Sequence, residues 1–218
     1  MERKTVARQG GGEELSTAVR IVEALKRDLI NGTLAPDSLI VEAQVGARFG
    51  VSKTPAREAL LRLSEMGFVT VIPGKGYTVT KLSWQQIKDL FEVRLLLECS
   101  AVELATTRAT PADVDELKAA AALPKGSSQS IERLLDANLR FHRTIWAATR
   151  NNRLVQLVSD VMDDLMRAMH TAMLSENIEE MAKQHLELTN LIAKKKTAAA
   201  RAAMAEHVDA TRRRLLNL

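Results

Sequence analysis

The stretch from Val51 to Gly76 holds side chains that are well suited to contact DNA. Thr54 and Arg57 lie one helical turn apart, and a helical wheel places both away from an apolar stripe, with Lys53 beside them. An arginine can form a bidentate hydrogen bond with guanine, whereas serine, threonine and lysine can fix phosphates. The residue types and their spacing therefore predict contacts with the bases and the backbone of a DNA major groove.

A single helix must position these side chains. Ser52 or Thr54 can cap its start, Pro55 is harmless in a first turn, where the backbone N–H has no partner, and Gly67 ends it. The stripe that the wheel predicts to be buried consists of Ala56, Ala59, Leu60, Leu63 and Met66.

The flanking residues predict the rest of a winged helix-turn-helix. Apolar periodicity and glycine stops predict two earlier helices, over Thr17–Asn31 and Glu42–Phe49. Residues rich in β-branched and aromatic side chains predict two strands joined by a turn with a basic tip, at Phe68–Ile72, Pro73–Gly76 and Tyr77–Thr80. Over residues 15–80 the order is helix, helix, helix, hairpin, which is typical of this motif.

From residue 81 to residue 218 the periodicity is helical throughout, so that the fold class is mainly α. We predict helices near residues 84–108, 111–122, 129–149, 151–174, 177–194 and 198–216. Ser83 and the pair Thr110–Pro111 support two of the helix starts. Six such helices predict an antiparallel bundle. The run Lys194–Lys196 lies at a helix C-terminus, where cations favour the helix dipole, and we prefer that interpretation to a nucleic-acid patch.

The bulk composition sets limits on the class of protein. A chain of 218 residues with a formal net charge of +4 has room for two domains and permits nucleic-acid binding without requiring it. The single cysteine, Cys99, excludes an internal disulfide and suits a reducing compartment. No apolar run approaches the roughly 20 residues that cross a bilayer, and an apolar signal core is lacking, so we expect a cytoplasmic location without a membrane partner. Charges and three glycines predict a flexible arm over residues 1–14.

Two segments of the chain resemble a known family. The run Val51-Ser52-Lys53-Thr54-Pro55-Ala56-Arg57-Glu58-Ala59-Leu60 is similar to the signature of the GntR family of bacterial transcription regulators, with Lys53 in place of the commoner arginine. The C-terminal half resembles the helical FCD effector domain of the FadR subfamily. The matching pieces are Glu92-Val93-Arg94, Leu97-Glu98, Phe141-His142, Asn152, His185 and His207. Together the two resemblances cover nearly the whole chain after the arm.

The resemblance implies a set of DNA-binding residues at the third helix and the wing tip, namely Ser52, Lys53, Thr54, Arg57, Gly74 and Lys75. Gly74 carries no side chain, so the backbone there can approach a minor groove closely. Some members place an arginine in the second helix for a further base contact, where this chain has Ala43. The alternatives are an ordinary solvated helix face and a winged helix that contacts a protein.

The resemblance also implies a divalent metal site with the ligands Asn138, His142, His185 and His207. Asn138 and His142 share one helix face, and three neighbouring helices can aim imidazoles at one point. Imidazole nitrogens suit Zn²⁺, which we expect, and Ni²⁺, and the sequence also leaves Mn²⁺ open. Family members have aspartate at the first position; asparagine is neutral, and Asp136 lies about 120° round the helix from His142. The alternative is a polar bundle core in which these side chains hydrogen-bond to each other and to water.

A small carboxylate effector would bind beside the metal. The family position that Arg94 matches lines the effector cavity, and a buried arginine needs an anionic partner. The alternative partner for Arg94 is Glu98, one helical turn later. Asn152 and Arg167 complete the predicted effector site, whereas His170 matches no metal position of the family.

The resemblance implies a ligand-responsive repressor that binds a palindromic operator in double-stranded DNA as a homodimer. The alternative is an architectural or ligand-independent DNA-binding dimer whose bundle serves only dimerisation. The chain lacks His-Glu-x-x-His, a Gly-rich phosphate loop and a Gly-x-Ser-x-Gly elbow, so we expect no enzyme.

Overall fold

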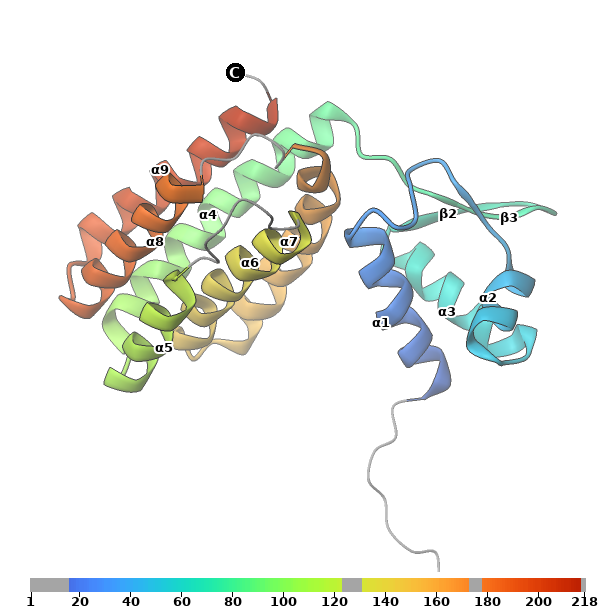
Figure 1. The fold of residues 1–218 in the computed structure, drawn as a ribbon, viewed down its shortest axis with the longest axis horizontal. Helices are drawn as coiled ribbons and strands as arrows, with labels where there is room; N and C mark the ends of the chain where they lie inside the picture. The colour runs from blue at the N-terminus through green and yellow to red at the C-terminus, as the bar shows by residue number, and fades with distance from the viewer. Residues whose placement is uncertain (1–15, 123–130, 173–177, 217–218) are drawn as a thin grey trace, which may run out of the picture. The chain divides into compact units, whose positions relative to one another are not determined.

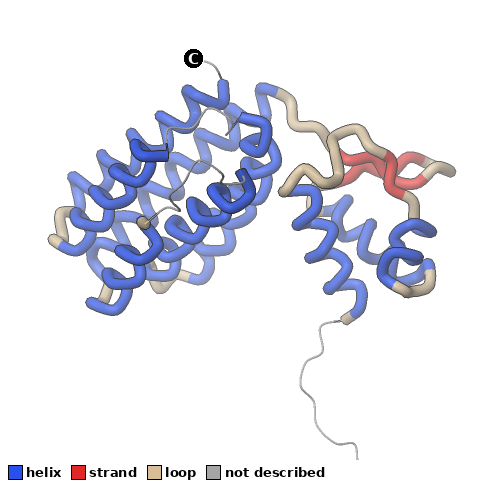
Figure 2. The backbone as a smooth tube through the Cα atoms, viewed as in Figure 1, coloured by secondary structure: helices blue, strands red, loops and turns tan. Residues whose placement is uncertain are grey.

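The computed structural model describes residues 16–122, 131–172 and 178–216, which fold into two compact units (Figures 1 and 2). The division falls after Thr80, and the short connection Ile30–Thr33 belongs with the second unit. The predicted arm over residues 1–14 and the predicted loop Pro124–Ser128 lie outside the described residues.

The first unit is a winged helix-turn-helix, as predicted. Its elements are α1 (Thr17–Ile30), β1 (Leu39–Ile40), α2 (Glu42–Phe49), α3 (Lys53–Glu65), β2 (Val69–Ile72) and β3 (Gly76–Val79). The three strands form an antiparallel sheet in the order β1-β3-β2, with Val69 opposite Val79 and Ile72 opposite Gly76. The β2–β3 hairpin is the wing, and it follows the third helix directly.

The core of this unit explains which face of α3 remains available. Ala56, Ala59, Leu60 and Leu63 are all 0% exposed, so that the opposite side of the helix faces outward. The prediction that Met66 shares this buried stripe is wrong, because Met66 is 42% exposed. The helix ends at Glu65, and Gly67 adopts a φ of 76°, so the wheel no longer applies at Met66.

A second glycine allows the wing to close against β1. Gly76 has a φ of 130°, and a Cβ placed there would lie 2.6 Å from the carbonyl oxygen of Ile40. The Cβ of any other residue would collide with this oxygen, so the pairing of β1 with β3 depends on a glycine at position 76.

The second unit is an all-helical bundle, and its helix bounds agree with the predicted ones to within a few residues. Its helices among the described residues are α4 (Trp84–Arg108), α5 (Pro111–Ala121), α6 (Ile131–Ala148), α7 (Asn152–Ala172), α8 (Ile178–Ala193) and α9 (Thr197–Leu216). Ser83 and Thr110 cap α4 and α5 through complete capping boxes, with Gln86 and Asp113 as the third helical residues. None of the described helices combines the length and apolar character needed to cross a membrane.

Helix α4 runs through the middle of the bundle and contacts α6, α7, α8 and α9 (Figure 1). Its inward face and the facing helices bury large apolar side chains, among them Phe91, Phe141, Trp146 and Met162. Any polar group that α4 turns inward therefore lies in an apolar interior bounded by the other helices.

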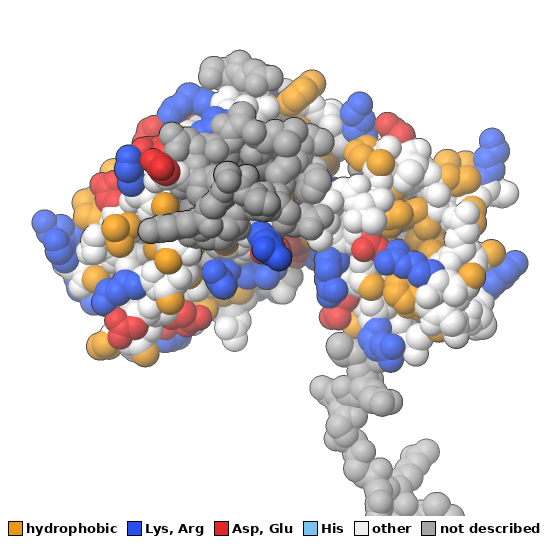
Figure 3. All heavy atoms as spheres, viewed as in Figure 1, with side chains coloured by type: hydrophobic (Ala, Val, Ile, Leu, Met, Phe, Trp, Pro, Cys, Tyr) orange, Lys and Arg blue, Asp and Glu red, His pale blue; other side chains and the backbone are white. Residues whose placement is uncertain are grey.

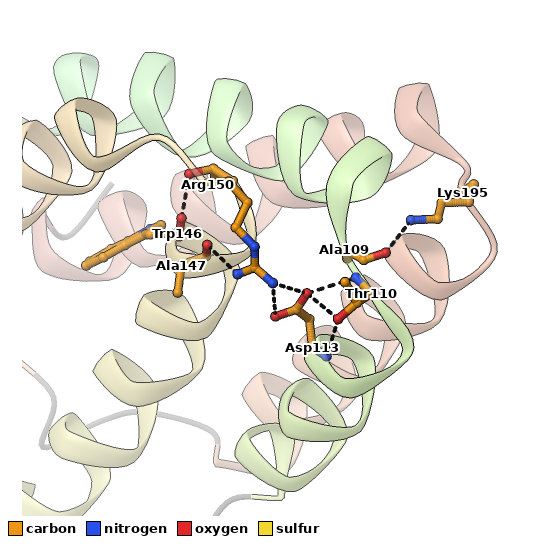
Figure 4. A network of polar contacts seen from close by, with 8 residues as sticks. Ala109, Thr110, Asp113, Trp146, Ala147, Arg150 and Lys195 are labelled. Atoms are coloured by element: carbon orange, nitrogen blue, oxygen red, sulfur yellow. Dashed lines mark hydrogen bonds and ion pairs between the residues drawn. The ribbon is translucent and has the colours of Figure 1, made fainter.

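Polar contacts fasten the turns at one end of the bundle (Figure 4). Arg150, in the α6–α7 turn, donates to both carboxylate oxygens of Asp113 at 2.9 and 2.7 Å. Lys195, in the α8–α9 turn, donates to the carbonyl oxygen of Ala109 at 2.8 Å, which places its cation at the C-terminal end of α4. Three connections are thus joined at the end of α4 that lies far from its capping box.

Candidate functional site

The outward face of α3 carries the polar side chains that the sequence assigns to DNA. Ser52, Lys53, Thr54 and Arg57 are exposed, and the Arg57 side chain is 67% accessible. At the tip of the wing Gly74 and Lys75 are also exposed, and the Lys75 N–H donates to the carbonyl oxygen of Ile72 at 3.0 Å. The predicted DNA-binding residues are therefore all accessible on one unit, on its third helix and its wing.

One partner of this face was missed from the sequence. Glu42, the first residue of α2, has its carboxylate 3.7 Å from Nε of Arg57. Burial raises the pKa of Tyr77, and the charge of Glu42 raises it further, against the effect of Arg57. Glu42 therefore adds a negative charge beside the arginine of the third helix. Ala43, the position where relatives can carry arginine, is exposed next to it.

Three buried histidines converge inside the bundle. His142 on α6, His185 on α8 and His207 on α9 are 0%, 0% and 3% exposed, and each offers a ring nitrogen within 4.8 Å of the others. Nε2 of His142 lies 3.1 Å from Nε2 of His207. In keeping with this burial, no histidine is seen among the described side chains on the face drawn in Figure 3.

The neighbours of His142 fix its tautomer. Nη2 of Arg94 lies 3.5 Å from Nε2 of His142, and a guanidinium can only donate, so Nε2 is the acceptor. Nδ1 then carries the proton, and it lies 2.9 Å from Oε1 of Glu98. On α9, Nδ1 of His207 lies 2.9 Å from Oε1 of Gln184. Donation to that oxygen leaves Nε2 of His207 with a lone pair as well.

This arrangement fits a metal ion. Two imidazole lone pairs that face each other at 3.1 Å repel unless a cation lies between them. Nitrogens bound to one Zn²⁺ at about 2.0–2.1 Å lie about 2.9–3.4 Å from each other, for coordination angles between square and tetrahedral. Both ring nitrogens of His185 and Oδ1 of Asn138 are buried without a hydrogen-bond partner among the described residues. Asn138, one turn before His142, is 2% exposed, whereas Asp136 is exposed.

His185 and His207 are neutral, which is the form that binds metals. Burial lowers the pKa of His185 to about 2, with smaller contributions from His142 and Arg94. The pKa of His207 is also well below its ordinary value, chiefly because of burial and then because of His142 and His185. The ring of His185 stacks on Phe141, with centroids 3.9 Å apart.

Arg94 and Glu98 bring opposite charges to the same place. Both are 0% exposed, and Nε of Arg94 lies 3.8 Å from Oε1 of Glu98, so the internal pair that the sequence allowed is present. Burial alone would raise the pKa of Glu98, but His142, Arg94 and Trp146 together lower it below its ordinary value. The contact of Glu98 with His142 was missed, because it joins α4 to α6 through side chains and leaves no periodic signal.

The other two predicted effector residues, Asn152 and Arg167, both lie on α7. Asn152 is exposed at the first residue of α7, whereas the three histidines are buried, and its place in an effector site stays a prediction. Asn151 precedes it and accepts from the Leu154 N–H, which caps α7. Arg167 on α7 forms an ion pair with Asp164, and its place in an effector site stays a prediction. The side chain of His170 lies outside the described residues.

Comparisons with known proteins agree with both units. The model of bacterial regulatory proteins of the gntR family matches residues 17–79, and the model of the FCD domain matches residues 89–210. The HTH-type transcriptional regulator McbR of Escherichia coli is 30% identical over 86% of this chain and 87% of its own length. The HTH-type transcriptional repressor GlaR of the same organism is 31% identical over 84% of this chain and 89% of its own.

Among solved structures, E. coli McbR/YncC superposes with a TM-score of 0.77 at 23% identity, over 93% of this chain and 98% of that one. This likeness concerns the fold, whereas the two family models and the curated relatives also carry the class of function. On that evidence the chain belongs to the GntR family of bacterial regulatory proteins and is a DNA-binding transcriptional regulator with an FCD domain, not an enzyme.

Proposed function

We propose that the protein is a ligand-responsive repressor of the FadR subfamily that binds a palindromic operator as a homodimer. Two copies of α3 would read the half-sites through Thr54 and Arg57, while Ser52, Lys53 and the wing residues Gly74 and Lys75 hold the backbone. The exposure of all six residues supports this assignment. The sign of regulation follows GlaR, a relative that is named a repressor.

The bundle would hold a divalent ion, with Zn²⁺ expected, through His142, His185, His207 and Asn138. The observation that carries this proposal is the 3.1 Å approach of the two Nε2 atoms, whose Nδ1 atoms already face Glu98 and Gln184. Because Asn138 is neutral, the four ligands leave the double charge of the ion intact. The ion would supply a Lewis-acid centre for an anionic oxygen.

The effector that fits this site is a small carboxylate. Nη2 of Arg94 points to the histidine cluster, 3.5 Å from Nε2 of His142, and a guanidinium holds a carboxylate with two parallel hydrogen bonds. A carboxylate could thus contact the ion and Arg94 together. It would change operator binding by binding two arrangements of the dimer with unequal affinity.

The test is a titration of the protein–operator complex with a panel of small mono- and dicarboxylates, using DNA selected from a random pool. We expect at least one acid to release the operator from zinc-loaded protein, and chelation to abolish the response. In Arg94→Gln the response should be lost, while Arg201→Gln, which changes an exposed arginine of α9, should respond like the wild type. If no acid acts with or without metal, the effector proposal fails and a ligand-independent regulator remains.

A further inference from the structure

Glu98 is the one carboxylate among the described side chains that is fully buried. Three donors from α4 and α6 surround it. Oε1 lies 2.9 Å from Nδ1 of His142 and 3.8 Å from Nε of Arg94, and Oε2 accepts from Nε1 of Trp146 at 2.9 Å. An imidazole N–H, an indole N–H and a guanidinium all favour the anionic form of the carboxylate.

The contact with His142 determines what the other side of the imidazole can do. With the proton held on Nδ1 by Glu98, Nε2 presents its lone pair to His207 and His185. A carboxylate behind a metal-binding histidine fixes the orientation of the ring and makes its free nitrogen a stronger donor to the metal. Gln184 occupies the equivalent position behind His207, but its amide brings no charge.

We infer that Glu98, acting through His142, is a positioning residue of the metal site and supplies the negative charge that the neutral Asn138 does not, while Gln184 is its uncharged counterpart behind His207. The inference rests on the proposed metal site and deepens it. It explains how a site with four neutral ligands can retain a divalent cation next to the buried guanidinium of Arg94.

The charges also bear on the class of effector. Glu98 and Arg94 are both fully buried and carry opposite charges, so Glu98 offsets the guanidinium beside the ion, and the double positive charge that remains is matched by the ligand. A site with a net positive charge favours an anion over a neutral molecule. A ligating aspartate would neutralise part of the charge at the ion itself, whereas Glu98 acts from behind His142.

Zinc binding to the chelator-stripped full-length protein tests this inference, with a chromophoric chelator as competitor. Glu98→Gln should weaken Zn²⁺ binding about 10–100-fold, the usual effect of removing a partner behind a ligand. Gln184→Glu should strengthen it, because it adds a carboxylate behind His207. Glu103→Gln is the matched control: it changes a carboxylate of the same helix that pairs with exposed Arg201, and its Zn²⁺ affinity should equal that of the wild type.

A second readout reports on the imidazole itself. In zinc-loaded wild-type protein, nitrogen-15 NMR should show His142 bound through Nε2, with a strongly deshielded Nδ1 proton. That proton should move upfield in Glu98→Gln.

The zinc-binding and NMR results either support or overturn the role inferred for Glu98. Wild-type Zn²⁺ affinity in Glu98→Gln with an unmoved Nδ1 proton, or ligation of His142 through Nδ1, would overturn the inference and leave the metal site standing. If Glu98→Gln does not fold, Gln184→Glu decides, and an affinity no tighter than that of the wild type counts against the inference. A wild-type protein that binds no Zn²⁺ removes the proposed metal site and the inference together.

Discussion

His185 and His207 are buried in the bundle interior, where the cost of removing a charge from water keeps them neutral. The ordinary pKa of histidine is about 6.5, and it applies to these residues only when the chain is unfolded. Burial lowers the pKa of His185 to about 2, and that of His207 falls well below its ordinary value. Acidification therefore adds protons to the unfolded state before it adds them to the folded one.

We expect the metal-stripped protein to lose stability as the pH falls below about 6.5. A group with a lowered folded-state pKa binds more protons when unfolded, so each histidine removes up to about 1.4 kcal/mol of unfolding free energy per pH unit. Urea unfolding between pH 7.5 and 5 measures this slope. His185→Phe, which keeps a ring against Phe141, should remove about half of it. A slope that is the same in this variant would show that His185 is not the group responsible.

Arg57 and Glu42 are two neighbouring residues whose single substitutions should change DNA binding in different ways. Arg57→Ala should lower the affinity for the selected operator at least about tenfold, because a bidentate base contact contributes about 1–3 kcal/mol of discrimination. Glu42→Gln removes a negative charge that lies 3.7 Å from the arginine, so it should raise the affinity for unrelated DNA. The ratio of specific to non-specific affinity should therefore fall. Gel-shift titrations at several salt concentrations measure both effects.

The matched controls for this pair are Arg20→Ala, at an exposed position of α1, and Glu58→Gln, which removes a carboxylate that pairs with Arg62 on the same helix. Both should keep the wild-type ratio. Unchanged operator affinity in Arg57→Ala would contradict the assignment of Arg57 to base reading.

Helical periodicity placed Thr54 and Arg57 outward, because a residue's angle on a helix follows from its position in the sequence. The partners of these residues could not be read in this way. Glu42 reaches Arg57 across the α2–α3 turn, and Glu98 reaches His142 across the α4–α6 contact, and both depend on helix packing that no local pattern encodes. The resemblance to relatives singled out the three histidines, but it did not identify the groups behind them.

At the scale of elements, the wing is the part most sensitive to a small change. Gly76→Ala should destabilise the first unit by several kcal/mol, about the size of a severe single substitution, because its Cβ would meet the carbonyl oxygen of Ile40 at 2.6 Å. Gly50→Ala is the control, since Gly50 also has a positive φ, of 66°, but has open space around its Cβ position. Its cost should be about 1 kcal/mol.

Thermal unfolding and operator binding of the two variants make the comparison. Equal losses of unfolding free energy in the two variants would mean that Gly76 is required by its backbone conformation and not by its contact with β1. A larger loss for Gly76→Ala, together with weaker operator binding, would link wing closure to DNA recognition.

Most helix bounds could be predicted because their ends carry local signals. The capping residues Ser83 and Thr110 and the left-handed Gly50 mark the ends through contacts within a few residues. Met66 shows where such reasoning fails, since a wheel drawn one residue beyond the end of a helix assigns a face that no longer exists. Asn151 caps α7, so Asn152 is the first residue of that helix and is exposed.

At the scale of the whole molecule, metal binding should stabilise the bundle, because all three histidines belong to the second unit. Zn²⁺ at about 100 times its dissociation constant should add about 2.7 kcal/mol to the free energy of unfolding. Circular dichroism of the chelator-stripped protein, melted with and without Zn²⁺, measures the shift. His185→Phe should lose most of it, and an equal shift in that variant would place the bound ion elsewhere.

Trp146 has a practical consequence of its own. The chain holds two tryptophans, and both lie in the bundle: Trp84 is 62% exposed, whereas Trp146 is fully buried and donates its indole N–H to Glu98. A water-soluble quencher will therefore quench the fluorescence of Trp84 first and leave the emission of Trp146. The ring centroid of Trp146 lies 6.3 Å from that of His142. The protein thus contains its own fluorescent sensor beside the histidines, with which candidate ligands can be screened without a label or DNA.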